Sequence, residues 1–218
     1  MKKSDDSQIC LDTKIQHYTF SYDNKNKVLD DMEIIIRGGE IVCINGVNGA
    51  GKTTLLKILS GLLDEYNTDE NIKKIRKESI FISNAPIMYD NLTGMENAKL
   101  LCDLWKKNHD IFDRNFQIYL KVFEMENYLD KEWSEYSLGM KYKTFLAAVL
   151  SLEIPILLMD EPLNAMDAKS QKKAIKILKE YVADKKHTII FSSHINTISS
   201  ELSDRSYILK GGKLYEEE

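Results

Sequence analysis

The stretch Gly46-Val47-Asn48-Gly49-Ala50-Gly51-Lys52-Thr53 decides the fold, because it fits the phosphate-loop pattern G-x-x-x-x-G-K-[ST] at every fixed position. The largely apolar segment 40–45 before it predicts a short buried strand, and the apolar spacing of 54–59 after it predicts a helix. This order of strand, loop and helix is the context that the pattern requires. The stretch therefore predicts a site for the phosphates of a nucleotide.

The residue types in this loop suit phosphate binding for separate physical reasons. Glycines let the backbone turn tightly enough for successive N–H groups to point at phosphate oxygens, and the positive end of the following helix favours the same anion. We expect Lys52 to reach the β- and γ-phosphates and Thr53 to offer its hydroxyl to Mg²⁺. By itself the loop predicts binding of a nucleoside triphosphate and does not identify a reaction.

The composition narrows the class of protein. At 218 residues the chain is long enough for one large domain, or for one domain with an inserted subdomain. Its 34 acidic and 30 basic residues give a net charge of −4, so there is no basic field for DNA or RNA and we expect no nucleic-acid partner. An odd, scattered set of cysteines suits a reducing, cytosolic compartment: Cys10, Cys43 and Cys102. Segment 1–7 turns polar where a signal peptide would turn apolar, and we expect a protein that does not itself cross a membrane.

Strands and helices alternate along the chain. Strands are predicted for 9–22, 28–36, 78–83, 154–159 and 188–192, with a final strand at 207–210. Helices are predicted for 139–152 and 169–183, and the block 94–128 is helical because apolar residues recur there at spacings of four, four and three: Phe112, Phe116, Leu120 and Phe123. Apolar strands that alternate with helices indicate a parallel sheet covered on both faces, so we expect an α/β core with a helical insertion.

Two further positions carry chemistry. Asp160 and Glu161 follow the strand predicted at 154–159, and an aspartate at such a strand end is where a phosphate-loop ATPase holds its Mg²⁺. Glu161 is placed to polarise a water for attack on the γ-phosphate. His194 follows the strand predicted at 188–192, at the same edge of the sheet, where it could contact the γ-phosphate or that water.

Taken together, these motifs make the chain similar to the nucleotide-binding subunits of ATP-binding cassette (ABC) transporters over nearly its whole length. Gly46 to Thr53 resembles the family's Walker A loop, Tyr136 to Met140 its signature, and Asp160-Glu161 its Walker B motif with the catalytic glutamate. Asn164 to Asp167 resembles the D-loop, and His194 the switch histidine.

The resemblance implies a fold and a division of the chain. The fold is an α/β P-loop NTPase (RecA-like) core with a mostly parallel sheet, an N-terminal antiparallel β portion and an inserted α-helical subdomain. The implied single domain spans 1–218, with 1–84 and 144–218 in the core and the helical subdomain with the signature at 85–143.

It also implies a set of site residues and two cofactors, ATP and Mg²⁺. The ATP contacts are the aromatic expected on the adenine and the loop itself: Tyr22, Asn48, Gly49, Ala50, Gly51, Lys52, Thr53 and Thr54. A partner copy adds Ser137 and Gly139. Mg²⁺ is expected at Thr53 and Asp160, with Asn84 reaching it through a water. Glu161, His194 and Lys52 are the implied catalytic residues.

The implied partners are a second copy of the chain, or a similar subunit, and an integral membrane permease. Two copies face each other head to tail with ATP between one copy's phosphate loop and the other's signature. The permease is expected to dock on a groove of the helical subdomain whose wall includes Pro86 to Tyr89. The implied location is cytoplasmic, at the inner face of the cell membrane.

Two departures from the family's pattern qualify the resemblance. The usual L-S-G-G-Q is Tyr136-Ser137-Leu138-Gly139-Met140 here, which resembles the variant in subunits of the antibiotic-resistance and bacteriocin-immunity exporters. Asn84 stands where a glutamine is expected, and its shorter side chain predicts weaker coupling to Mg²⁺.

The leading hypothesis is an ATPase that drives export of a peptide, an antibiotic or a lipid-like compound through a separate permease. The first alternative is a soluble ABC ATPase that acts in a process other than transport. The second is a nucleotide-gated binding module with poor hydrolysis, and the presence of Glu161 argues against it.

Overall fold

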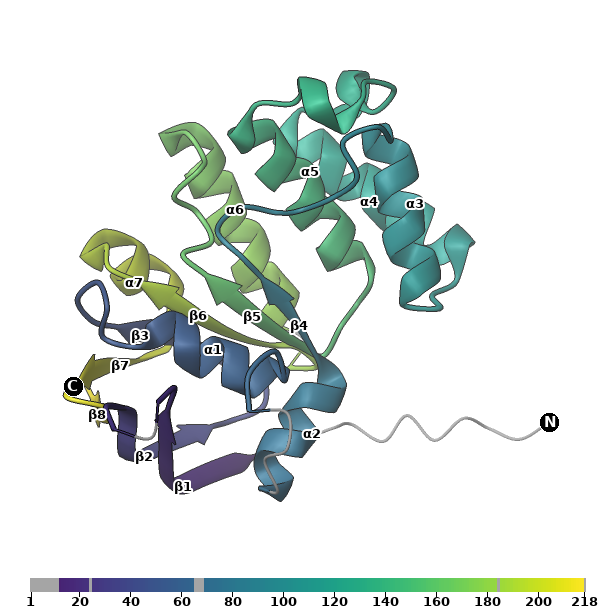
Figure 1. The fold of residues 1–218 in the computed structure, drawn as a ribbon. Coiled ribbons are helices and arrows are strands. Elements are labelled where there is room, and N and C mark those ends of the chain that lie inside the picture. The colour runs from purple at the N-terminus through teal and green to yellow at the C-terminus, as the bar shows by residue number, and fades with distance from the viewer. Residues whose placement is uncertain (1–11, 24, 65–68, 184, 218) are drawn as a thin grey trace. The chain divides into compact units, whose positions relative to one another are not determined.

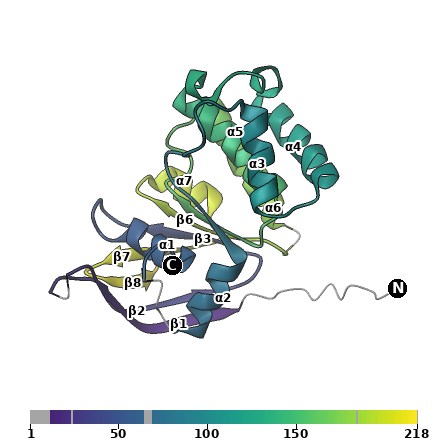
Figure 2. The same cartoon turned by 45° about the vertical axis from the view of Figure 1, so that its right-hand side comes forward.

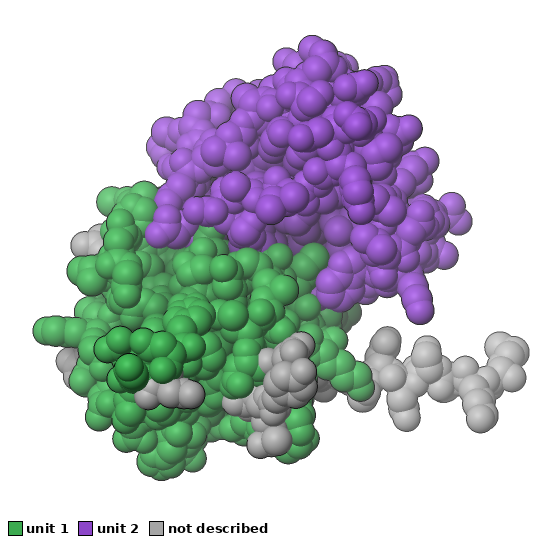
Figure 3. Space-filling view, viewed as in Figure 1, with its two compact units in different colours: residues 1–81, 155–160, 179–218 green, residues 82–154, 161–178 purple. Residues whose placement is uncertain are grey.

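The computed structural model describes residues 12–23, 25–64, 69–183 and 185–217 (Figure 1). The chain divides into two compact units, which Figure 3 shows in different colours. Unit 1 comprises residues 1–81, 155–160 and 179–218, and unit 2 comprises residues 82–154 and 161–178. The expected helical subdomain, 85–143, falls within the range of unit 2, which also takes in the first part of the helix after β5.

The main sheet has six strands in the order β4-β5-β6-β3-β7-β8. Their bounds are β3 Ile41–Asn45, β4 Ser79–Ile82, β5 Ile156–Asp160, β6 Thr188–Ser193, β7 Arg205–Lys210 and β8 Lys213–Glu216. Strands β5, β6, β3 and β7 run parallel, and β8 closes the edge antiparallel to β7. β5 and β6 are buried along their whole length, as expected for strands covered on both faces.

The prediction that 207–210 is the final strand was wrong, because β8 follows it after Gly211 and Gly212. Both glycines have positive φ angles, 58° and 79°, which form the tight turn between the two strands. β8 has only four residues and none is buried, so the apolar pattern on which the prediction relied is missing there.

A separate two-stranded antiparallel sheet precedes the phosphate loop. Its strands are β1 Thr13–Ser21 and β2 Lys27–Ile36, and buried residues alternate with exposed ones along much of β2. Residues 9–11 of the strand predicted at 9–22 lie outside the described residues. An antiparallel β portion therefore lies at the N-terminal side of the fold, as expected.

One apolar core joins the two sheets of unit 1. Helix α1 (Lys52–Ser60) follows the phosphate loop, and helix α2 (Glu70–Glu78) lies beside it; Figures 1 and 2 show both near β1 and β2. The buried apolar side chains of both helices belong to the same cluster as those of β1, β2 and β3. The core thus fixes the start of α1 against the sheet, and with it the end of the phosphate loop.

Unit 2 consists of helices and their connections. These are α3 Gly94–Leu104, α4 His109–Phe123, η1 Glu126–Tyr128, η2 Trp133–Glu135, α5 Leu138–Ser151 and the first part of α6 Ala168–Val182. The helical spacing noted in the sequence is confirmed, since its four members are all buried on one face of α4: Phe112, Phe116, Leu120 and Phe123. α5 packs against both α4 and α3.

Two further helices lie in unit 1. α2 and α7 (Asn196–Leu202) were not predicted, and α7 packs on β3 and β6. Within the described part of the chain, no helix combines the length and the apolar character needed to span a bilayer.

Candidate functional site

The loop after β3 has the backbone geometry that its glycines predict. Gly49 and Gly51 have φ angles of 81° and 107°, in the region that L-residues with side chains rarely adopt. A Cβ atom on Gly51 would also lie 2.8 Å from a methyl carbon of Val28, so the position has no room for a side chain. Helix α1 begins directly afterwards, with no acidic residue in its first turn and no side-chain cap. Its positive end is therefore open to an anion.

Lys52 folds back onto the loop that contains it. Its Nζ donates to the carbonyl oxygens of Gly46 at 2.7 Å and Val47 at 3.2 Å, and only 5% of the residue is exposed. The Lys52 ammonium group is thus bound by two neutral carbonyl oxygens of its own loop. A phosphate oxygen would replace them, because its negative charge makes a stronger hydrogen bond.

The ends of β5 and β6 meet the start of α1 in a buried hydrogen-bonded cluster. The Thr53 hydroxyl donates to Asp160, with Oγ1 2.8 Å from Oδ2 and 3.0 Å from Oδ1. The Ser192 hydroxyl donates to Asp160 Oδ1 at 2.6 Å. Asp160 is 7% exposed and lies opposite Ser192 in the register of β5 and β6. Thr53 and Asp160, predicted from motifs 107 residues apart, are therefore in contact.

Tyr22 lies near the loop but is oriented by other contacts. Its hydroxyl shares a hydrogen bond with Thr54 Oγ1 at 3.0 Å, and its ring meets that of Phe20 edge to face with centroids 5.1 Å apart. Tyr22 as a whole remains 63% exposed. Tyr22 thus presents an aromatic ring to solvent, and its contact with Thr54 holds that ring at the start of α1.

His194 follows β6 and is exposed. It lines a pocket of about 340 Å³ with the first residues of the phosphate loop and residues of the neighbouring strands: Asn45, Gly46, Val47, Ser193, Ile208 and Glu217. The structure therefore places His194 at the sheet edge that carries the loop, as its position after the strand predicted.

In unit 2, Glu161 begins the segment after β5. Its φ angle is 48°, a left-handed conformation that is uncommon for a residue with a long side chain. The side-chain amide of Asn164 donates to Glu161 Oε2 at 2.8 Å. Asp167 then caps α6, and the hydrogen bonds from the Ser170 hydroxyl and backbone N–H lower its pKa to about 2. The segment 161–167 thus has a defined conformation of its own.

The signature segment begins helix α5. Ser137 is the N-cap residue, and its Oγ accepts from the backbone N–H of Met140 at 3.2 Å. No acidic residue lies in the first turn of α5. A Cβ atom on Gly139 would lie 3.0 Å from the Ala165 carbonyl oxygen, so this position permits a close approach of the two segments. Ser137 and Leu138 are both exposed.

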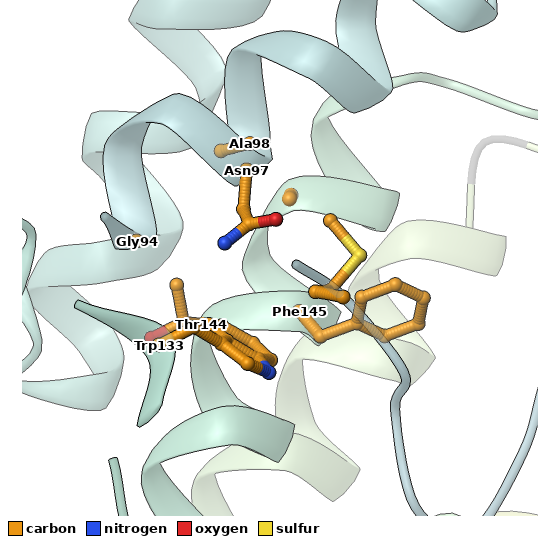
Figure 4. A pocket seen from close by; sticks show the side chains of 8 residues that line it. Gly94, Asn97, Ala98, Trp133, Thr144 and Phe145 are labelled. Atoms are coloured by element: carbon orange, nitrogen blue, oxygen red, sulfur yellow. The ribbon is translucent and has the colours of Figure 1, made fainter. Parts of the chain in front are cut away.

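The segment after β4 carries Asn84, which is exposed. Further on, the buried Asn97 fixes residues 89–93: its Oδ1 accepts from the Tyr89 N–H at 3.0 Å, and its Nδ2 donates to the carbonyls of Tyr89, Leu92 and Thr93. Asn97 also lines a small cavity with Met88, Trp133 and Phe145 (Figure 4). Pro86 is buried, whereas Ile87 and Tyr89 are 90% and 64% exposed. In the segment Pro86 to Tyr89, which was predicted to form the wall of the permease groove, Ile87 and Tyr89 are thus the exposed side chains.

Residues 29–164, more than half of the chain, match the family model described as ABC transporter. The chain belongs to the ABC transporter family.

Relatives and solved structures agree with this assignment. The energy-coupling factor transporter ATP-binding protein EcfA1 of Mycoplasmopsis synoviae is 30% identical, over 92% of this chain and 80% of that protein. The methionine import ATP-binding protein MetN of Clostridium tetani is 28% identical, over 86% of this chain and 63% of that protein. A solved ATP-binding subunit of an ABC transporter matches with a TM-score of 0.84 and 25% identity, over 94% of this chain and 89% of that one.

As a member of the ABC family, the chain is an ATP-binding protein and an ATPase. The predicted fold class is confirmed: a P-loop NTPase with a mostly parallel sheet, an antiparallel β portion and a helical insertion. The roles of individual site residues stay predictions, which the geometry above makes specific.

Sequence reasoning missed the site contacts of Ser192 and Asn45, and it named Asn164 as part of the D-loop without its contact to Glu161. Ser192 donates to Asp160, Asn164 donates to Glu161, and Asn45 precedes the phosphate loop within the pocket that His194 lines. For Ser192 the sequence signal was partial: it ends the strand predicted at 188–192, but the neighbour of that strand in the sheet cannot be read from the sequence. Asn45 offered a weaker one, as a polar residue that ends an otherwise apolar strand.

Proposed function

We propose that the chain is the ATP-hydrolysing subunit of a transporter whose membrane-spanning permease is a separate protein. The observation that carries this proposal is the contact between Thr53 and Asp160, which joins the phosphate loop to the second motif. Two oxygen ligands from distant motifs at the mouth of a phosphate loop suit Mg²⁺ and a triphosphate better than any other ligand class.

Binding of ATP begins with the loop. The β- and γ-phosphates displace the carbonyls of Gly46 and Val47 from Lys52 Nζ, because a phosphate oxygen offers a charge-assisted hydrogen bond. The backbone of Asn48 to Gly51 and the positive end of α1 add N–H donors, and Thr53 and Thr54 complete the cradle. The exposed ring of Tyr22 takes the adenine by stacking.

The donor set also fits a magnesium ion. Mg²⁺ is commonly bound by one or two carboxylates together with phosphate oxygens, and Thr53 Oγ1 and the Asp160 carboxylate already lie within 3.0 Å of each other. When bound, the ion neutralises charge that develops on the phosphoryl oxygens. Ser192 keeps Asp160 oriented toward Thr53, and Asn84 is assigned an outer role through a water.

Hydrolysis is assigned to Glu161 and His194. The Glu161 carboxylate accepts the proton of the attacking water, and the Asn164 amide orients that carboxylate. His194 contacts the γ-phosphate or the water from the end of β6. Lys52 stabilises the charge that moves onto the leaving phosphate.

A second copy of the chain, or a similar subunit, completes the site. The N-terminus of α5 presents an uncompensated positive end, and Ser137 accepts a hydrogen bond from Met140 while its own hydroxyl hydrogen stays available as a donor. In a head-to-tail dimer, Ser137 and the Gly139 N–H donate to the γ-phosphate held by the partner's loop. In this proposal the single ATPase domain spans 1–218, with 85–143 as its helical subdomain.

The permease is assigned to the surface formed by Ile87 and Tyr89, which are exposed while Asn97 fixes the neighbouring backbone. In this proposal the chain lies at the cytoplasmic face of the membrane. Export of a peptide, an antibiotic or a lipid-like compound is supported by the Ser137-Leu138-Gly139-Met140 signature variant. Because one matched relative is a methionine import protein, the direction needs its own measurement.

The test is co-purification of the chain with its permease from native membranes, followed by transport and ATPase assays in vesicles. We expect Tyr89→Glu to abolish transport and leave basal ATP hydrolysis intact. Ile118→Glu is the matched control, since Ile118 is 57% exposed on α4 and should tolerate a charge in both assays. Loss of transport in both variants would show that the effect is not specific to Tyr89. Recovery of the chain only from the soluble fraction would favour the soluble ABC ATPase.

A further inference from the structure

The last side chain before the phosphate loop is an amide whose hydrogen-bonding groups are all used. Asn45 ends β3, and its Nδ2 donates to Ser199 Oγ of α7 at 3.1 Å and to Glu217 Oε2 at 2.7 Å. Its Oδ1 accepts from the Cys43 thiol at 3.2 Å. An amide has two donor hydrogens and one acceptor oxygen, so every group has a partner and the side chain has one orientation.

The backbone of Glu217, the residue that accepts from Asn45, is itself fixed by a hydrogen bond. Its backbone N–H donates to the Ser206 carbonyl oxygen at 2.9 Å, which continues the pairing of this segment with β7 beyond β8. The carboxylate then reaches Asn45 at 2.7 Å, a short distance that suits a hydrogen bond to an ionised acceptor. Residues 172 positions apart are thus joined at the base of the loop.

The third partner of Asn45, the Cys43 thiol, stays protonated and can therefore donate a hydrogen bond. Burial, with a smaller contribution from the negative charge of Glu217, raises the pKa of the Cys43 thiol to about 12. The thiol therefore stays protonated at any physiological pH and continues to donate to Asn45.

The position of Asn45 explains why this network matters for the loop. The next residue, Gly46, has no side chain, and a Cβ there would lie 2.8 Å from the Leu209 carbonyl oxygen. Gly46 therefore cannot be anchored through a side chain of its own. Asn45 also pairs with Ser193, the residue before His194, in the register of β3 and β6. Asn45, Gly46, His194 and Glu217 line the same pocket of about 340 Å³.

We propose that Asn45 and Glu217 form a positioning pair that fixes where the phosphate loop leaves β3 and so sets how tightly the loop binds ATP. This inference rests on the proposed function, because it assigns the pair to the same nucleotide site. The pair acts on ground-state binding, since neither side chain is assigned to the reacting atoms. Its loss raises the KM for ATP and leaves kcat nearly unchanged.

The experiment measures KM, kcat and the affinity for a fluorescent ATP analogue in the purified chain. We expect Glu217→Ala to raise the KM for ATP about fivefold and to change kcat less than twofold. Glu217→Gln should restore most of the affinity, because its amide oxygen accepts the same hydrogen bond. Asn45→Asp should be the weakest binder, because it sets two carboxylates against each other. Glu216→Ala is the matched control, since Glu216 accepts from Arg205 Nε at 3.0 Å instead.

The outcomes separate this inference from the proposed function. A wild-type chain that neither binds nor hydrolyses ATP would overturn both. A wild-type chain that hydrolyses ATP, with Glu217→Ala and Glu216→Ala equal in KM, would overturn the positioning pair alone. If Glu217→Ala does not fold, equal affinities in Glu217→Gln and Asn45→Asp, both checked by melting temperature, would overturn it as well.

Discussion

The two units place their functional residues in opposite ways. In unit 1, hydrogen bonds join Thr53 to Asp160 across 107 positions of sequence. Lys52 bonds to the carbonyls of its own loop, and both Lys52 and Asp160 are buried. In unit 2, the Met140 N–H donates to Ser137 Oγ and the Asn164 amide donates to Glu161, and each of these contacts joins residues three positions apart. Unit 1 is thus preorganised to bind a ligand, whereas the residues of unit 2 are presented on short local turns. The difference suggests that binding and hydrolysis can be separated by mutation.

The largest effect is expected in unit 2. Glu161→Gln removes the general base, so we expect hydrolysis to fall by a factor of about 10² to 10⁴ while the affinity for ATP is retained. Phosphate release and equilibrium nucleotide binding are the two measurements. A variant that still hydrolyses ATP at the parent's rate would remove Glu161 from its assigned role, and loss of ATP binding would contradict the separation of the two units.

The next effect is expected in unit 1. Lys52→Ala removes the cation that the loop holds, and we expect the affinity for ATP to fall about 10- to 100-fold, as for loss of a charge-assisted hydrogen bond. Lys57→Ala, in the last turn of the same helix, is the matched control and should bind normally. Equal affinities in the two variants would show that the loop's charge is not used for binding.

A smaller effect tests the signature. Ser137→Asp keeps an N-cap side chain but adds a negative charge where the partner's γ-phosphate is expected. We expect ATP hydrolysis to fall about tenfold, an electrostatic penalty at a donor site, with unchanged melting temperature and unchanged nucleotide binding by the single copy. A lower melting temperature without loss of hydrolysis would restrict Ser137 to its capping role.

A variant of Asn84 tests whether this residue of unit 2 takes part in Mg²⁺ binding. Asn84→Gln lengthens the side chain by one methylene, so we expect the Mg²⁺ concentration for half-maximal hydrolysis to fall about threefold as a water-mediated contact becomes direct. Titration of hydrolysis with Mg²⁺ is the measurement. An unchanged Mg²⁺ dependence would remove Asn84 from the metal site.

The smallest effect concerns an ion cluster within unit 2. Hydrogen bonds from Lys173 and Lys169 lower the pKa of Glu124 from 4.5 to about 2. A carboxyl group whose pKa is lowered by folding contributes its full stabilisation when the pH is above its pKa in the unfolded chain, 4.5. This stabilisation is lost as the pH falls through about 2, the pKa of Glu124 in the folded protein. The melting temperature of Glu124→Gln should therefore lie slightly below that of the parent at pH 7 and converge with it near pH 2.

What could be predicted from the sequence follows the same division between local and long-range order. The phosphate loop, the strand that ends in Asp160 and the buried face of α4 were all predicted, because each is encoded in adjacent residues. Helix α2 was missed because only Ile72 and Ile75 of its residues are buried, so the charged residues dominated its pattern. The contacts of Asn45 and Ser192 were missed because their partners depend on strand order, which no local pattern states.

The left-handed backbone at Glu161 has a consequence for how this protein could change over time. Glycine and asparagine adopt a φ angle near 48° most readily. At Glu161, a longer side chain at this angle costs about 1 kcal/mol or more in backbone strain. Selection for thermal stability alone would therefore favour replacing Glu161, a change that, under its proposed role, also removes the general base. Under the role proposed for Glu161, the glutamate therefore supports turnover at a cost in stability.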